Sequence, residues 1–174
     1  MKHFLIVVDM QNDFVDGSLG SAEAQAIVPE VVKKINAFEG TILATLDTHP
    51  ENYLETAEGK KLPVAHCVED TDGWEINDDV LEALENKGYT RVRKETFGSI
   101  DLPYIIERIA GSEDFSVELI GLCTDICVVS NALLLKAHFP EKEITVDSGC
   151  CAGVSTDTHD AALKVMSCCQ INIK

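Results

Sequence analysis

The stretch FSVELIGLCTDICV, residues 115–128, decides the fold class, because it predicts a buried strand that runs straight into a buried helix. Residues 115–122 are expected to form the strand. Residues 125–137 are apolar nearly all round, which is typical of a helix buried on several sides. A strand joined in this way to a helix is the repeating unit of parallel α/β sheets.

The same strand–helix alternation recurs along the whole chain. Short apolar runs predict strands at 4–8, 41–46, 89–93, 115–122, 143–147 and 169–173. Helical spacing predicts helices at 27–38, from Asn77 or Asp78 to Gly88, from Asp101 as N-cap to 109, at 125–137 and at about 158–168. Such alternation predicts an α/β fold with a doubly wound parallel sheet and helices on both faces.

The length and composition predict one globular domain that spans residues 1–174. Hydrophobic residues make up 45% of the chain, which is ordinary for a globular protein. No apolar run approaches the roughly 20 residues of a membrane span, and the run 4–8 is too short for the core of a signal peptide. We therefore expect a cytoplasmic protein.

Net charge limits the classes of binding partner, and cysteine content indicates the cellular compartment. With 14 basic and 30 acidic residues the formal charge is −16, which argues against nucleic acid and anionic membranes because both would be repelled. The seven cysteines are odd in number and include two adjacent pairs, Cys150–Cys151 and Cys168–Cys169, which does not suit a disulfide framework. Reduced cysteines fit the cytosol.

Four of the predicted strands end in ionisable or nucleophilic residues. They are Asp9, the pair Asp47 and His49, Lys94, and the segment that leads to Cys127. In open α/β sheets, ligands bind beyond the carboxyl ends of the strands. The sequence therefore predicts that these groups share one functional edge of the sheet.

Cys127 is the candidate nucleophile. With Thr124 as the helix N-cap, Cys127 falls in the first turn, where the helix dipole lowers a thiol pKa and free amides can bind an oxyanion. The alternatives are a buried packing role or a C-x3-C pair with Cys123. Asp9 and Lys94 are the candidate proton acceptor and cation, although an Asp–Lys pair can also be purely structural.

A candidate metal site begins at Asp47 and continues into a long irregular segment, residues 48–76. Asp47-x-His49, followed by Glu58 and His66, offers carboxylate and imidazole ligands that suit Zn²⁺, Fe²⁺ or Mn²⁺. Three other acids compete with Glu58 for its place: Glu51, Glu55 and Glu69. The alternative is a solvated acidic loop with incidental histidines.

The remaining aromatic and histidine residues carry weaker signals. Phe14 and Trp74 are each candidates to stack on a planar substrate, with ordinary packing as the alternative. His3, His138 and His159 have no ligand-like neighbours in the sequence and are interpreted as structural.

Three motifs together resemble a known family. They are VDMQNDF at 8–14, Lys94 with Thr96-Phe97, and GLCTDICV at 121–128. They resemble the signatures of the isochorismatase-like cysteine hydrolases, and within that superfamily the chain is most similar to nicotinamidases over almost its whole length. The resemblance implies a three-layer α/β/α sandwich with a mainly parallel six-stranded sheet.

The resemblance also implies a catalytic apparatus. The family's triad corresponds to Asp9, Lys94 and Cys127, and its oxyanion hole to the backbone N–H groups of Cys123 and Cys127. A cis peptide bond is implied between Leu122 and Cys123.

The implied metal ligands are Asp47, His49 and His66, with Glu58 as the best fourth ligand and Glu55 as its competitor. Zinc is the first choice, and iron and manganese are the alternatives.

The implied activity is hydrolysis of nicotinamide to nicotinate and ammonia through a thioester. Phe14 matches one aromatic wall of the family's substrate pocket, whereas residues 62–65, LPVA, contain no aromatic where a second wall often lies. Related enzymes act on carbamoyl compounds, ureidoacrylates or maleamate, and a non-catalytic interaction module is a further alternative. The family resemblance also implies a homo-oligomer, either a dimer or a tetramer.

Overall fold

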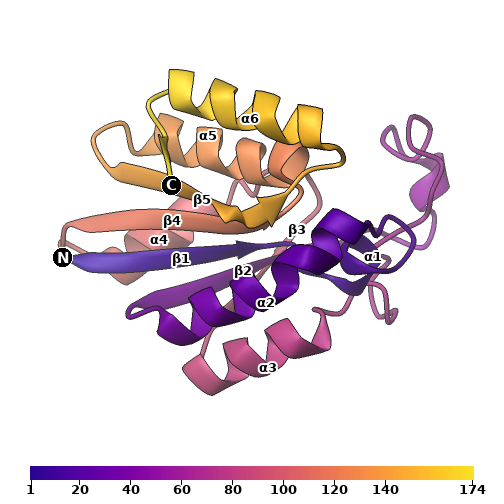
Figure 1. Cartoon of the computed structure of the whole chain (residues 1–174), viewed down its shortest axis with the longest axis horizontal. Coiled ribbons are helices and arrows are strands. Elements are labelled where there is room, and N and C mark those ends of the chain that lie inside the picture. The colour runs from indigo at the N-terminus through magenta and orange to yellow at the C-terminus, as the bar shows by residue number, and fades with distance from the viewer.

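A six-stranded sheet runs through the middle of the computed structural model, which describes all residues 1–174 (Figure 1). Its strands are β1 (Lys2–Val8), β2 (Thr41–Asp47), β3 (Thr90–Lys94), β4 (Phe115–Leu122), β5 (Glu143–Ala152) and β6 (Asn172–Ile173). The order across the sheet is β3-β2-β1-β4-β5-β6, and every neighbouring pair is parallel. The predicted doubly wound parallel sheet is confirmed.

Helices cover both faces of this sheet and complete three layers (Figure 1). The helices of one face are α2 (Ala22–Ala37) and α3 (Asp78–Lys87), and those of the other are α4 (Leu102–Ala110), α5 (Val129–His138) and α6 (Thr156–Cys168). Three short segments are α1 (Asn12–Val15), the 3₁₀ turn η1 (Tyr53–Glu55) and the π-helical turn η2 (Thr124–Val128). None of these helices has the length and apolar character that a bilayer span requires.

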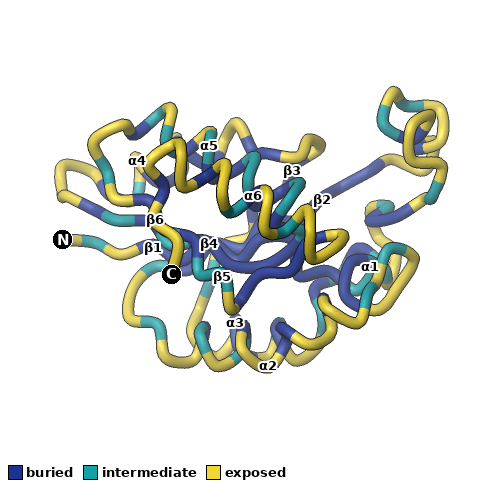
Figure 2. Tube along the Cα trace, turned by 45° about the horizontal axis from the view of Figure 1, so that its top comes forward, coloured by how far each residue is buried: buried dark blue, intermediate teal, exposed yellow.

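Two hydrophobic cores lie between the layers, and strand β1 contributes to both. Leu5 and Val7 point into one core, whereas Phe4, Ile6 and Val8 point into the other, as the two-residue period of a strand requires. All five are at most 1% exposed. Figure 2 shows that the strands are buried along most of their length and that exposed residues follow the helices and loops.

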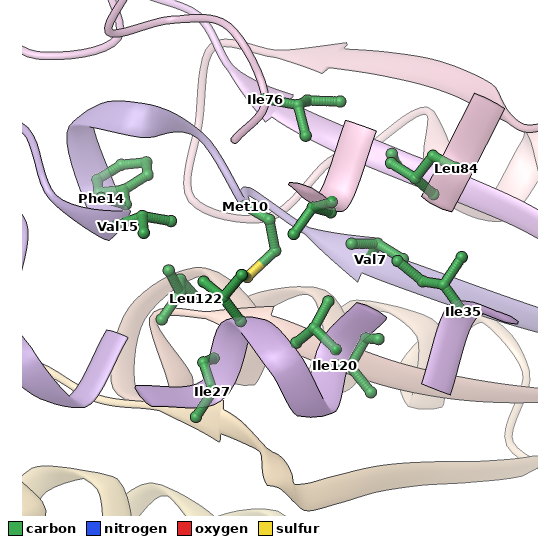
Figure 3. Packing of buried hydrophobic residues seen from close by; sticks show 14 of the residues in the cluster. Val7, Met10, Phe14, Val15, Ile27, Ile35, Ile76, Leu84, Ile120 and Leu122 are labelled. Atoms are coloured by element: carbon green, nitrogen blue, oxygen red, sulfur yellow. The ribbon is translucent and has the colours of Figure 1, made fainter. Parts of the chain in front are cut away.

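The core under α2 and α3 fixes those helices to the sheet. Figure 3 shows Ile35 of α2 and Leu84 of α3 packed around Val7 and Ile120 of the sheet. Full burial of one such aliphatic side chain contributes about 1.5–3 kcal/mol to stability. Helix α2 begins earlier than the apolar spacing predicted, because Ser21 Oγ accepts a hydrogen bond from the Ala24 amide at 3.0 Å and caps the helix.

Other element boundaries also differ from those predicted. Strand β5 continues to Ala152 instead of ending at 147, and β6 is limited to two residues. Neither Asn77 nor Asp101 caps its helix through its side chain. At the start of α4, Ser99 Oγ instead accepts from the Leu102 amide at 3.2 Å.

The carboxyl ends of β1 to β4 meet at one edge of the sheet (Figure 1). The order of the strands reverses between β1 and β4, which makes this edge the topological switch point where open α/β sheets bind ligands. The long segment between β2 and α3 extends from the same edge (Figure 1). The fold therefore gathers the predicted functional residues at one place.

Gly121 permits the closest approach of two strands at this edge, which generates a stability prediction. It has φ +114°, and a Cβ there would overlap the carbonyl oxygen of Val8 in β1. Gly88 is the matched control, because its φ is +78° but a Cβ there meets nothing within 4 Å. We expect Gly88→Ala to cost about 1 kcal/mol, from its positive φ alone, and Gly121→Ala to cost about 3 kcal/mol or more. Urea unfolding midpoints measure both, and equal losses would contradict the steric argument.

Candidate active site and metal centre

The three residues of the predicted triad lie together at the switch point. Asp9 follows β1, Lys94 ends β3, and Cys127 lies in the η2 turn after β4. Lys94 Nζ is 2.7 Å from Asp9 Oδ2 and 3.5 Å from Cys127 Sγ. All three residues are buried, so these contacts form away from bulk water.

Strand β2 holds the Asp9 carboxylate in place. Thr45 Oγ1 donates a 2.6 Å hydrogen bond to Asp9 Oδ1, and the Asp9 amide donates to the Thr45 carbonyl at 3.2 Å. Asp9 has φ +47°, a conformation that costs a non-glycine residue roughly 1–3 kcal/mol and tends to persist at functional sites. Thr45 was not among the predicted site residues, because its only signal in the sequence is a hydroxyl in an otherwise apolar part of β2.

Burial and charge set the protonation of the triad. Burial raises the pKa of Asp9 above its ordinary value, although the nearby Lys94 ammonium opposes the shift. Burial alone would lower the pKa of Lys94, but Asp9, Cys127 and Asp47 together raise it, so the ammonium stays charged. Asp9 is thus a stronger base than an ordinary aspartate and is paired with a permanent cation.

The expected low pKa of the Cys127 thiol is wrong for this resting site. Burial, reinforced by the neighbouring Asp9 carboxylate, raises the pKa of Cys127 well above its usual value. Thr124 does not cap the helix through its side chain, and the turn that carries Cys127 is π-helical. The thiol is therefore neutral at rest and must lose its proton within the site.

Cys123 is the weaker candidate for a nucleophile. Burial raises the pKa of its thiol to about 12, with a further contribution from Asp125. Cys123 makes no contact with Lys94 like that of Cys127. All seven cysteines are free, and the cluster suited to a metal contains none of them. The structure thus favours Cys127 over Cys123 and gives no support to a C-x3-C pair.

The backbone beside Cys127 leaves an amide group without a partner. The peptide bond between Leu122 and Cys123 is cis, as the family resemblance implied. The Cys123 amide has no backbone acceptor, so its N–H is free for a ligand. Asn131 Nδ2 donates to the Cys127 carbonyl at 2.8 Å, and Asn131 Oδ1 accepts from the Ser99 amide at 2.9 Å, which fixes the far end of the turn.

Three of the predicted metal ligands form a buried cluster. Ligand atoms of Asp47, His49 and His66 all lie within 4.8 Å of one another. Glu58 Oε1 lies 3.7 Å from His49 Nε2 and 3.8 Å from His66 Nε2, so it joins this group from the long segment. Glu55 is instead 3.4 Å from the side chain of Asn52. The geometry favours Glu58 over Glu55.

The donor set fits a divalent ion. His66 Nδ1 is 2.8 Å from the Val64 carbonyl, which orients the ring so that Nε2 faces the cluster. Burial opposes ionisation of Asp47, but the imidazoles of His49 and His66 and the charge of Lys94 hold the pKa of Asp47 well below its usual range. Two imidazoles and two carboxylates around one point make a set that zinc, iron and manganese accept.

Asp47 also connects the two centres. Its Oδ2 lies 3.0 Å from His49 Nε2, while its Oδ1 lies 3.0 Å from Lys94 Nζ. The Gln11 carboxamide holds the backbone of Asp47, because it accepts from the Asp47 amide at 2.7 Å and donates to the Asp47 carbonyl at 2.9 Å. Gln11 was likewise not among the predicted site residues.

A cavity of about 540 Å³ opens onto both centres. Cys127 and three candidate ligands, Asp47, Glu58 and His66, line it, so the thiol and the metal cluster face the same space. Phe14 also lines the cavity, and its ring centroid is 5.4 Å from that of His66. This position agrees with the proposed stacking role of Phe14.

Trp74 does not contribute to the cavity, so its predicted role as a stacking residue is corrected. Its side chain is buried in the core beneath α2 and α3. The indole Nε1 donates to Thr48 Oγ1 at 2.9 Å, and the Arg93 guanidinium lies over the ring at 4.9 Å. Trp74 therefore anchors the long segment to the sheet.

Comparison with known proteins agrees with this geometry. The chain matches the family model described as the isochorismatase domain over residues 3–173. It is 28% identical to a nicotinamidase of Schizosaccharomyces pombe, covering 92% of this chain and 87% of that protein. It is also 28% identical to a nicotinamidase/pyrazinamidase of Mycobacterium tuberculosis, covering 97% and 96%.

A solved structure shares the architecture. A pyrazinamidase of Pyrococcus horikoshii in complex with zinc superposes with a TM-score of 0.81 and 29% identity, over 100% of this chain and 99% of that one. The family match, which spans nearly the whole chain, shows that this protein belongs to the isochorismatase domain family.

Proposed function

We propose that this protein is a cysteine amidohydrolase that converts nicotinamide and water to nicotinate and ammonia. The observation that carries the proposal is the single cavity onto which the Cys127 thiol and a metal-binding cluster both open. The relatives named nicotinamidase, which match nearly the full chain, support the choice of nicotinamide.

The first half of the reaction releases ammonia. Cys127 Sγ attacks the amide carbon while Asp9, whose pKa is raised by burial, takes the thiol proton. The backbone N–H groups of Cys123 and Cys127 stabilise the oxyanion. Asp9 then gives its proton to the departing nitrogen, the C–N bond breaks, and a thioester remains on Cys127.

The second half hydrolyses the thioester. Asp9, again ionised, takes a proton from a water molecule that attacks the thioester carbon. The C–S bond breaks, the proton on Asp9 returns to the Cys127 sulfur, and nicotinic acid leaves and releases its carboxyl proton to solvent as nicotinate. Lys94, at 2.7 Å from Asp9, holds the carboxylate in place and offsets charge on the sulfur, to which it lies 3.5 Å away.

Asp47, His49, Glu58 and His66 would hold one divalent ion, with zinc as the first choice and iron or manganese as alternatives. The zinc complex of the Pyrococcus horikoshii pyrazinamidase supports this order. When bound, the ion supplies a Lewis acid that anchors a ring nitrogen and so orients the substrate. Phe14 offers its ring face to the same substrate.

A second candidate keeps the triad and changes the substrate to a small amide or carbamoyl compound without a ring. The observation that favours it is Leu62, which lines the cavity where family members often have a second aromatic wall. A cytoplasmic location, a homo-oligomer and the single-domain organisation remain predictions from the sequence and the resemblance.

If Cys127 is the nucleophile, removal of its sulfur should abolish most of the activity. Cys127→Ala should lower ammonia release from nicotinamide at least roughly a thousandfold, because it removes the sulfur that forms the thioester and Cys123 makes no contact with Lys94. Cys151→Ala is the matched control, since Cys151 is a buried thiol of the same hydrophobic core that does not line the cavity. Turnover by the Cys127 variant near that of the wild type would sink the mechanism.

If Glu58 is a metal ligand and Glu55 is not, substitutions of these two glutamates should affect zinc affinity differently. Glu58→Ala should weaken binding of Zn²⁺ at least roughly tenfold in a chelator competition, because it removes a candidate ligand. Glu55→Ala should leave the affinity unchanged. If the two variants behave alike, Glu58 is not a ligand. If protein purified without chelator carries fewer than ~0.2 ions per chain, the site itself is wrong.

The substrate assignment is tested by a panel of amides. We expect nicotinamide to exceed maleamate, N-carbamoyl amino acids and ureidoacrylate in kcat/KM by at least roughly tenfold, since only the ring amide can use both Phe14 and a ring-nitrogen anchor. Ammonia release measures all four. A ring-free compound as the best substrate would favour the second candidate instead.

A further inference from the structure

His159 contacts the turn that carries the nucleophile. Its Nδ1 lies 2.8 Å from the Oγ1 of Thr124, a hydrogen bond between residues 35 positions apart in the chain. Thr124 is completely buried and begins η2, directly after Cys123. The bond therefore acts on the residue next to one proposed oxyanion donor and in the same turn as the other, Cys127.

A second contact, from the loop that precedes α6, holds the next residue of the turn. Both carboxylate oxygens of Asp125 accept from the Val154 amide, at 3.1 and 3.2 Å. A Cβ on Gly153 would lie only 3.0 Å from the His159 Cβ, so the loop between β5 and α6 is packed tightly against α6. Figure 1 shows α6 alongside α5, with its first turn towards the edge where β4 ends.

We propose that His159 is a positioning residue that fixes the oxyanion hole through Thr124. This extends the sequence interpretation of His159 as merely structural. Asn131 holds the far end of the turn at the Cys127 carbonyl, and the bond from His159 holds its near end. With both ends fixed, the N–H groups of Cys123 and Cys127 keep their spacing. A displacement of about 1 Å in such a site can cost roughly a hundredfold in rate.

The inference rests on the proposed function and predicts an effect on chemistry more than on substrate binding. An oxyanion exists only in the tetrahedral state, so donors that drift lower kcat and leave KM nearly unchanged. Loss of a purely structural histidine would instead lower stability, without a selective decrease of kcat at unchanged KM.

The kinetic test uses a matched pair of histidines. His3 Nδ1 lies 2.9 Å from Ser116 Oγ, so it makes the same kind of hydrogen bond at the opposite edge of the sheet. We expect His159→Ala to lower kcat for nicotinamide about tenfold with KM within about twofold, and His3→Ala to change neither. His159→Asn, whose amide can replace Nδ1, should recover most of the loss.

An aldehyde analogue tests the oxyanion hole directly. Cys127 Sγ adds to the carbonyl carbon of pyridine-3-carbaldehyde, the C=O π bond opens, and the thiol proton passes to Asp9, which leaves a tetrahedral oxyanion. We expect the inhibition constant of this aldehyde to rise in His159→Ala by about the same factor as kcat falls, while that of nicotinate stays unchanged. Equal shifts for the two inhibitors would overturn the proposal.

A double-mutant cycle tests the route through Thr124. Thr124→Val removes the hydroxyl with little change of shape. If the bond is the route, the double variant with His159→Ala should lose no more kcat than either single variant. If the factor by which kcat falls in the double variant equals the product of the factors in the two single variants, His159 does not act through Thr124.

A measurement without substrate separates this inference from the proposed function. Hydrogen exchange of the amides at 123–128 should be several-fold faster in His159→Ala and unchanged in His3→Ala. A wild-type protein that releases no ammonia from any amide would refute the proposed function, and the exchange rates would still decide whether His159 restrains the turn. Unchanged exchange, or faster exchange with full kcat, overturns the inference.

Discussion

The buried ammonium of Lys94 is the interaction on which the site depends. The side chain is only 1% exposed, and a charge removed from water costs several kcal/mol unless it is paired. Asp9 at 2.7 Å and Asp47 at 3.0 Å supply that pairing from the ends of two other strands. Because Asp47 also belongs to the candidate metal cluster, one cation joins the candidate triad to that cluster.

The strand order explains why these groups meet. Strands β3, β2, β1 and β4 are neighbours in the sheet, so Lys94, Asp47, Asp9 and the segment leading to Cys127 end side by side. The parallel register pairs Asp47 directly with Lys94. A parallel sheet therefore brings four positions that are far apart in the sequence together at one edge.

The sequence could predict the strand ends and the motif residues, because periodicity and residue type are local signals. It could not predict that Trp74 turns into the core, since burial of an aromatic ring in a long irregular segment depends on tertiary packing. Nor could it show that the Thr124 hydroxyl bonds to His159 instead of capping a helix, because the partner lies on another element. Thr45 and Gln11 were missed for the same reason, as their roles are contacts across strands.

The charge balance of the site determines how the thiol must react. The Cys127 thiol lies beside the Lys94 ammonium, which is paired with the carboxyl groups of Asp9 and Asp47. A free thiolate would add a negative charge in a buried space next to acidic side chains, and for this reason burial and Asp9 raise the pKa of Cys127. A proton that moves only from sulfur to Asp9 leaves the total charge unchanged. In the proposed mechanism the thiolate forms as the C–S bond forms, so the oxyanion donors must already be in place at that moment. In that mechanism a thiol that is neutral at rest depends on oxyanion donors that are already in position, so the contacts of His159 and Asn131 with the η2 turn should add to the effect of the triad.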